Sequence, residues 1–430
     1  MKIVIPPIYE RDDDALKKDS DFFKRKVFSE NLTRLFLNSD SGMVVSIDAK
    51  WGDGKTSFVR SWVERLKEKE ELLPIYFDAY RNDFTSDAFL SIAAAIQKNL
   101  PESKIKEKSA DLWKGLVDST VRVAQSSIKL GVGSAVTALS AGMVNGRDLV
   151  NGVGEIAGDV ISGAIAYEAE ERLQTHLEAE ESIEHYKKAL GRLLKSSEKE
   201  RKIVFFVDEL DRCRPDFAMQ VIEKIKHLFS VDGVIFVLVM NKGQLEKTVA
   251  HAYGVSSKDA EVYLQKFIHI ETRLPGINNM LRDGSGGLEE YINSLLGAHG
   301  IPKDALRFNA SAFYSLVGGE CLNMNPRAIE RAFSLATMVL MTMDNADATG
   351  MMLVFFSVAI KVAAPDFYER YRSGRIQVSI GNSQADTVEK KCGDIISKAF
   401  EGYFDQRAAN LIVFKEVAEI CSRIDMFARF

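Results

Sequence analysis

Short, continuous apolar runs separated by amphipathic stretches dominate the hydrophobic pattern of the first 275 residues. Runs that are continuous, and do not alternate in polarity, are typical of strands buried on both faces of a parallel sheet. Helical patterns follow most of these runs, which predicts an α/β fold whose strands are joined by crossover helices. We expect strands at Met43–Ile47, Pro74–Phe77, Ile203–Val207, Val234–Met240 and Phe267–Ile270.

The gap between the second and third runs is much longer than the roughly 30 residues of a βαβ unit. We therefore expect a helical insertion at about residues 98–199, which includes a charged helix with one apolar stripe over about residues 168–195. Residues 130–146, LGVGSAVTALSAGMVNG, carry no charge but are rich in glycine and polar side chains. A membrane span needs about 20 mainly apolar residues, so we favour a soluble helical hairpin. Membrane docking through residues 130–166 is the alternative.

The pattern changes after Pro275, where strand-like runs end and helical periodicity begins. This change predicts a core of residues 1–275 followed by a C-terminal helical domain of residues 276–430. We expect its helices near Leu288–Leu296, Ala310–Gly318, Pro326–Met341, Met351–Val362 and within Asp386–Phe430.

Directly after the first strand, the chain reads DAKWGDGKTSF and matches the phosphate-binding pattern GxxxxGK[ST], with Ala49 in place of the first glycine. Glycines let backbone amides turn toward an anion, and the following helix directs its positive end to the same place. Lys55 would neutralise phosphate charge, and the Thr56 hydroxyl would hold Mg²⁺. A structural turn is the alternative. The expected nucleotide-binding residues are Trp51, Gly52, Asp53, Gly54, Lys55, Thr56 and Ser57.

The third strand leads into an acidic pair in the segment IVFFVDELDRCRP. A magnesium-dependent ATPase needs such a pair beside its phosphate loop, with Asp208 holding the metal and Glu209 acting as the base for the attacking water. The alternative is that these acids only cap the next helix.

Two further polar residues are candidates for contact with the nucleotide. Asn241 ends the fourth strand, where its amide would reach the γ-phosphate or the attacking water; a turn before Gly243 is the alternative. Arg327 and Arg331 lie four residues apart in NPRAIERAF, on one helical face. We expect Arg327 to reach the nucleotide from a helical lid, the alternative being a surface ion pair with Glu330.

Composition limits the function classes. The chain has 56 basic and 61 acidic residues and a net charge of −5, which does not indicate nucleic-acid binding, although a local basic groove stays open. The N-terminal MKIVIPPIYERDDD lacks a signal-peptide core, which predicts a cytoplasmic protein. The cysteines lie far apart and show no zinc-site spacing: Cys213, Cys321, Cys392 and Cys421.

Taken in order, these motifs resemble those of the KAP family of P-loop NTPases. AKWGDGKTSF is similar to the family's GxWGxGKTS loop, including Trp51, and VDELDRCRP resembles its DDLDRC box. The resemblance continues in IYFDAYRND, YLQKFIHIETRLP and NPRAIERAF, and covers roughly residues 25–97 and 200–340.

The resemblance implies an ASCE-type parallel sheet, in which the Asp208 strand lies beside the neighbour of the phosphate-loop strand, with a C-terminal helical lid. It also implies ATP and Mg²⁺ as ligands, and an ATPase that acts as a motor or switch in a bacterial anti-phage defence system. The implied partners are further copies of the chain or proteins of the same operon. In an oligomer, Arg212 or Arg214 would act as an arginine finger; pairing with Asp211 or Asp216 is the alternative.

Three departures from the family pattern bear on activity. The methyl group of Ala49 would disfavour a positive φ and weaken nucleotide affinity. This favours the alternative function, a weakly hydrolysing, nucleotide-stabilised scaffold that assembles partner proteins. Glu209 replaces an aspartate, but glutamate is the base of other ASCE ATPases. Asp78 and Tyr80 replace Asn and Trp, which leaves the role of that segment open.

Overall fold

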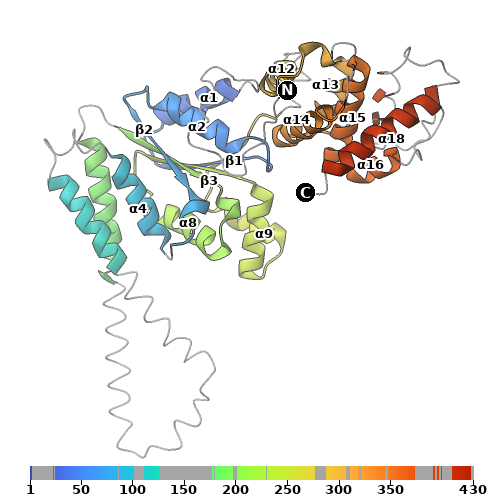
Figure 1. Cartoon of the computed structure of the whole chain (residues 1–430). Helices are drawn as coiled ribbons and strands as arrows, with labels where there is room; N and C mark the ends of the chain where they lie inside the picture. Colours follow the sequence, from blue (N-terminus) through green and yellow to red (C-terminus); the bar gives the residue numbers. More distant parts are fainter. Residues whose placement is uncertain are drawn as a thin grey trace, which may run out of the picture. The chain divides into compact units, whose positions relative to one another are not determined.

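The computed structural model describes most of the chain (Figure 1). Short gaps and isolated residues aside, the described ranges are 25–100, 111–125, 180–196, 201–276, 287–372 and 409–427. The chain divides into two compact units. The sheet unit contains residues 31–49 and 59–273, and the helical unit contains residues 1–30, 50–58 and 274–430. The division into a core of residues 1–275 and a domain of residues 276–430 stays a prediction.

A parallel sheet with strand order β2-β3-β4-β1-β5 forms the centre of the sheet unit. β4 separates β1 from β3, so the α/β class and the expected ASCE-type arrangement are confirmed. Asp48 pairs with Met240, and Asp208 pairs with Val239, which brings the carboxyl ends of β1, β3 and β4 to one edge. The strands are β1 Met43–Asp48, β2 Leu72–Asp78, β3 Lys202–Asp208, β4 Val234–Met240 and β5 Ile270–Arg273.

The fifth strand begins later than expected. We predicted it at Phe267–Ile270, whereas β5 runs over Ile270–Arg273. The helix before it, α10, extends to Gln265, and the amides of Lys266 and Phe267 still bond back to the carbonyls of Tyr263 and Leu264. These turn hydrogen bonds keep the chain from extending, so the apolar run marks the buried turn before the strand.

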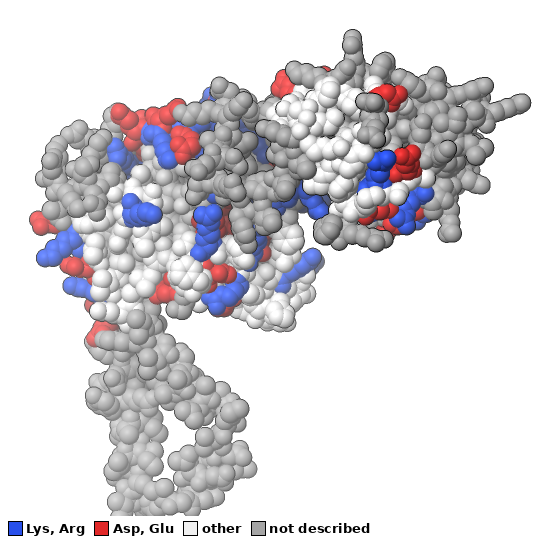
Figure 2. Space-filling view, in the orientation of Figure 1, with Lys and Arg blue, Asp and Glu red and all other residues white. Residues whose placement is uncertain are grey.

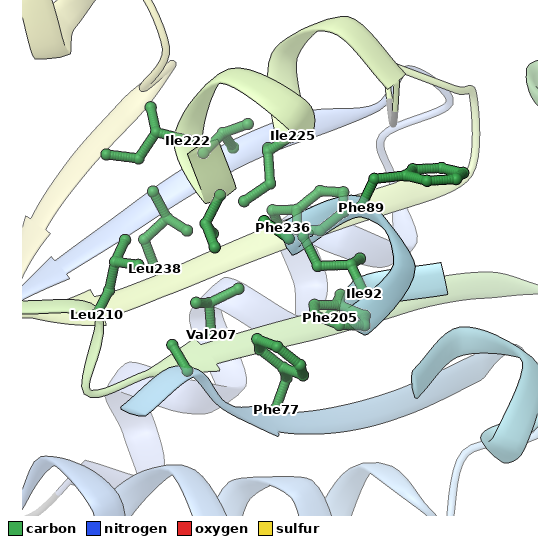
Figure 3. Close-up of a cluster of buried hydrophobic side chains, with 14 of the residues drawn as sticks. Phe77, Phe89, Ile92, Phe205, Val207, Leu210, Ile222, Ile225, Phe236 and Leu238 are labelled. Carbon is green, nitrogen blue, oxygen red and sulfur yellow. The ribbon is translucent and has the colours of Figure 1, made fainter. Parts of the chain in front are cut away.

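Helices cover both faces of the sheet (Figure 1). Consecutive residues of β3 point to opposite faces, as the period of a strand requires. Phe206 meets Trp62 of α2 at a ring-centroid distance of 5.0 Å, whereas Phe205 packs on the other face in the cluster under α4 and α8 (Figure 3). The helices are α1 Arg25–Leu37, α2 Lys55–Leu66, α3 Ala79–Asn82, α4 Ala88–Asn99, η1 Leu210–Arg212, α8 Pro215–Leu228, α9 Lys242–Tyr253 and α10 Ser257–Gln265.

The insertion between β2 and β3 is helical where it is described, at residues 111–125 and 180–195. Tyr186 is buried and meets Phe89 of α4 edge to face at 5.2 Å. The apolar stripe predicted for the insertion is present where the helix is described, and it packs on α4. The stretch 130–166 lies outside the described residues. Within the described part of the chain, no helix has the length and apolar character that a membrane crossing requires.

A second apolar core holds the helical unit together. Phe333 of α14 and Phe355 of α15 lie 4.9 Å apart between ring centroids. The structure has helices at the four positions predicted between residues 288 and 362, and α18 lies within the predicted stretch 386–430, where most of residues 386–408 lie outside the described residues. α16 and the short η2 are additions. The elements are α12 Gly287–His299, η2 Lys303–Leu306, α13 Ala310–Gly318, α14 Pro326–Leu340, α15 Ala348–Ala363, α16 Pro365–Arg372 and α18 Ala409–Phe427.

Candidate functional site

The loop between β1 and α2 has the glycine-dependent conformation that its sequence predicts. Gly52 has a φ of 89° and Gly54 a φ of 75°, a left-handed region that glycine enters without steric cost. The carboxylate of Asp53 accepts the amide of Lys50 at 2.8 Å, which closes the turn, and α2 begins at Lys55. The local fold therefore has the form of a phosphate-binding loop; ligand binding itself stays a prediction.

Two charged side chains of this loop, Lys55 and Asp53, are buried or partly buried. Lys55 is only 8% exposed, and its Nζ lies 3.4 Å from the carbonyl oxygen of Lys50. Burial raises the pKa of Asp53, an effect that the hydrogen bond from Lys50 and the charges of Arg25 and Lys55 oppose. The loop thus holds a buried ammonium group beside its glycines. Of the other expected ligands, Trp51 is exposed, and Thr56 and Ser57 are half-buried in the first turn of α2.

Ala49 is compatible with the loop conformation. Its amide donates to the carbonyl of Met240 at 3.1 Å, as a continuation of the β1–β4 pairing. Among the described non-glycine residues, positive φ angles occur at Glu209 and Asn323, so Ala49 has none. The expectation that the methyl group of Ala49 meets a positive φ was therefore wrong, because this position has no left-handed conformation. A weaker nucleotide affinity has lost that reason and stays a prediction.

Ala49→Gly is accordingly expected to change ATP affinity less than about threefold. Glycine adds freedom to the unfolded chain without relieving strain, so the substitution should lower stability by about 0.5–1 kcal/mol. Titration with Mg²⁺-ATP and thermal unfolding would check both values. A gain of tenfold or more in affinity would contradict the assignment of an unstrained Ala49.

The acidic pair ends β3, as predicted. Asp208 is fully buried and accepts hydrogen bonds from the hydroxyl of Tyr76 at 3.1 Å and from the amide of Glu209 at 2.9 Å. Burial, followed by the charge of Asp208, raises the pKa of Tyr76, so this hydroxyl stays a donor. The Glu209 carboxylate pairs with Arg212 at 3.0 Å.

Glu209 occupies an unusual backbone conformation for a residue with a side chain. Its φ of 58° and ψ of 26° are left-handed, and its side chain makes no cap hydrogen bond to η1. The interpretation of Glu209 as a helix cap is therefore not supported. Strained non-glycine residues cost about 1–3 kcal/mol and gather at functional sites, which favours a functional role for this carboxylate.

The two arginines after β3 have partners inside the sheet unit. Arg212 pairs with Glu209, whereas Arg214 pairs with Asp83 and, at 3.8 Å, with Asp216. The alternative to the finger role, a pairing with Asp211 or Asp216, is confirmed for Arg214, which pairs with Asp216. An arginine-finger role for either residue stays a prediction.

Asn241 is the N-cap residue just before α9, and its Oδ1 accepts the amide of Gln244 at 3.3 Å. The carboxylate of Asp48, at the end of β1, accepts the next amide, that of Lys242, at 3.0 Å. Asn241 thus has a structural role, as a helix cap, and its role as a sensor of the nucleotide stays a prediction. Its position at the carboxyl edge of the sheet is compatible with both.

Within the helical unit, the start of α14 lies against the phosphate loop. The Nδ2 of Asn325 donates to the carbonyl of Trp51 at 3.0 Å, and the amide of Arg327 donates to the carbonyl of Gly52 at 3.2 Å. Arg327 is exposed, as is Arg331. The structure therefore brings Arg327 to the loop through its backbone.

This arrangement can be compared with known proteins. The KAP family P-loop domain matches residues 25–340, well over half of the chain. The chain belongs to the KAP family. The match spans the sheet, the phosphate loop, the acidic pair and the helices up to the end of α14.

Two curated proteins are similar to this KAP chain. The phage T7 exclusion protein of Escherichia coli K12 is 23% identical over 65% of this chain and 37% of its own length. The uncharacterized protein MJ0182 of Methanocaldococcus jannaschii is 28% identical over 39% of this chain and 82% of its own length. The chain thus spans little more than a third of the phage exclusion protein.

Among solved structures, the Aeropyrum pernix ORC2 protein in its ADPNP-ADP complexes is similar over 95% of both chains, with 12% identity and a TM-score of 0.35. Its ADP form has a TM-score of 0.33, with 11% identity over 92% of this chain and 85% of that one. Likenesses of this size carry no argument about the function of the KAP chain.

Three residues that contact either the phosphate loop or the acidic pair of the KAP chain were not predicted from sequence: Arg25 and Asn325 at the loop, and Tyr76 at Asp208. The Asn-Pro pair that opens α14 is a recognisable helix start, so the cap at Asn325 was predictable. Its second hydrogen bond, to the loop, was not, because it joins residues far apart in the chain. Tyr76 and Arg25 gave no sequence signal of their own.

Proposed function

We propose that this KAP chain binds ATP with Mg²⁺, hydrolyses it, and serves as a motor or switch in a bacterial anti-phage defence system. The observation that carries the proposal is the register of the sheet. It brings the end of β1, from which the phosphate loop continues, to the same edge as the acidic pair of β3, with β4 between them.

The residues present suit a nucleotide and its cation. The amides around Gly52 and Gly54, together with Lys55, would bind the phosphates. Thr56 and the buried Asp208 would hold Mg²⁺, a hard cation that prefers oxygen ligands. Bound Mg²⁺ neutralises phosphate charge. Glu209 would take a proton from the attacking water, with Asn241 and Arg327 as sensors.

The defence role rests on one relative. The phage exclusion protein shares 23% identity with this chain, and a role in phage exclusion is what its name states. The scaffold alternative rested chiefly on Ala49, and the backbone conformation there removes that argument. Hydrolysis is therefore the better proposal.

The partners we propose are further copies of the chain or proteins of the same operon. Nucleic acid is not favoured, because Lys and Arg are interspersed with Asp and Glu over the face of the sheet unit in Figure 2, and the net charge is −5. We propose ATP as the nucleotide, because the segment Asn241-Lys242-Gly243-Gln244 lacks the aspartate of a guanine-specific motif.

The test is the nucleotide chemistry of the purified chain. We expect Mg²⁺-ATP to bind and phosphate to be released, with release abolished by EDTA and restored by added Mg²⁺. GTP should compete poorly. Failure of ATP to bind would overturn the proposal, and tight binding without phosphate release, with and without the operon's other products, would establish the scaffold.

A further inference from the structure

Three successive carbonyl groups of the phosphate loop are held by donors from elsewhere in the helical unit. The Nδ2 of Asn325 bonds to Trp51, and the amide of Arg327 bonds to Gly52. The guanidinium of Arg25 donates to the carbonyl of Asp53 at 2.8 Å. The loop is thus held through its carbonyl groups by α14 and by the start of α1.

Arg25 is an unusual partner for a loop, because it is a charged side chain that is 7% exposed. Its Nε also donates to the carbonyl of Pro275 at 3.0 Å, and its guanidinium lies 4.7 Å from the ring centre of Phe23. A buried charge is costly unless its polar atoms are satisfied. Here main-chain carbonyls provide that satisfaction, so Arg25 links the loop to the chain just after β5.

Each of the two polar side-chain atoms of Asn325 makes a hydrogen bond. Its Oδ1 accepts the amide of Ala328 at 2.9 Å and so caps α14, while its Nδ2 holds the loop. A Cβ atom on Gly52 would lie 2.6 Å from this Oδ1. The side chain and the loop are therefore in close contact, and Gly52 leaves room for it.

The orientation of the carbonyls has a consequence for the amides. In a trans peptide the C=O and N–H groups point in opposite directions. Holding the carbonyls of Trp51 and Asp53 therefore directs the amides of Gly52 and Gly54 the other way. The middle peptide is fixed at both ends, because the amide of Asp53 bonds to Lys50 within the turn.

We propose that Arg25 and Asn325 are positioning residues that hold the phosphate loop in the conformation in which the amides of Gly52 and Gly54 face the phosphates. This inference rests on the proposed nucleotide function. The two side chains act from outside the ligand and preorganise the loop, which lowers the cost of binding. ATP binding then stabilises the contact between the loop and the start of α14, and that contact in turn raises the affinity for ATP by the same factor.

Asn325→Ser separates the two hydrogen bonds. Serine is a good helix N-cap, so α14 keeps its cap, while the amide donor to Trp51 is lost. One net hydrogen bond corresponds to about 3- to 10-fold in affinity. We expect the KM for ATP to rise by that factor with kcat within about twofold, because an interaction equal in ground and transition states affects KM alone.

The matched control is Asp347→Ser, which replaces another N-cap of the same unit, that of α15. It should leave KM unchanged while shifting thermal stability as much as Asn325→Ser does. For Arg25, Arg25→Met should raise KM more than Arg25→Lys, because lysine keeps one charged donor for the carbonyl of Asp53.

Hydrogen exchange provides a second readout. ATP should slow exchange at the Arg327 amide of the wild type, and this protection should shrink in Asn325→Ser while α15 is unaffected. The inference would be overturned if the wild type bound ATP and Asn325→Ser had the same KM and the same ATP-induced protection as the wild type. An absence of ATP binding in the wild type would instead overturn the proposed function.

Discussion

Glu209→Gln is expected to lower the rate of ATP hydrolysis by about 100- to 10,000-fold, the usual contribution of a general base. Glutamine keeps the size of the side chain and a carbonyl oxygen for Arg212, but it cannot accept a proton from water. The fold should tolerate the change, because the residue stays in its left-handed conformation at the end of β3. ATP affinity should stay within about threefold, so that the loss falls on kcat. Phosphate release and ATP titration measure the two effects.

Glu246→Gln is the matched control. Glu246 is also a poorly exposed glutamate of the sheet unit, and it lies 3.7 Å from the ammonium group of Lys242. Since it lies on α9 and has no assigned role, its replacement should leave hydrolysis within about twofold of the wild type. If Glu209→Gln hydrolysed ATP at the wild-type rate, the base would have to be another residue.

Trp62→Ala is expected to lower the free energy of unfolding by about 3–5 kcal/mol, the usual cost of removing a large buried aromatic side chain. Trp62 is 1% exposed and meets Phe206 of β3 and Phe36 of α1 at ring-centroid distances of 5.0 and 5.8 Å. Its Nε1 donates to the hydroxyl of Thr33 at 3.0 Å. The substitution therefore leaves a cavity where α1 and α2 pack on the sheet. Urea unfolding followed by circular dichroism measures the loss.

Two further variants show whether packing is the cause. Trp62→Phe loses the hydrogen bond to Thr33 but keeps most of the aromatic packing. Because packing dominates, it should lower the free energy of unfolding clearly less than Trp62→Ala does. Phe84→Ala removes an aromatic ring that is 81% exposed and should change stability by less than about 0.5 kcal/mol. Equal losses for Trp62→Ala and Phe84→Ala would contradict the assignment of Trp62 to the core.

A strand was predictable from sequence where it is buried on both faces, because all of its residues are then apolar. Val234–Met240 is buried at every position and was predicted with its observed bounds. The run at Phe267 failed as a strand because a buried turn after a helix has the same apolar pattern, and only its hydrogen bonds distinguish the two. Ala49 failed for a related reason: a motif records residue types, whereas the need for glycine depends on the local φ.

Residue type and order alone determined the α/β class, the glycine turn before Lys55 and the acidic end of β3. These follow from short-range chemistry: strand burial, backbone freedom and charge at a helix start. Only the tertiary structure decided that Tyr76 bonds to Asp208, and that Arg25 and Asn325 hold the loop by its carbonyls. Such hydrogen bonds join residues up to 274 positions apart, and nothing in the local sequence records which donor reaches which carbonyl once the chain has folded.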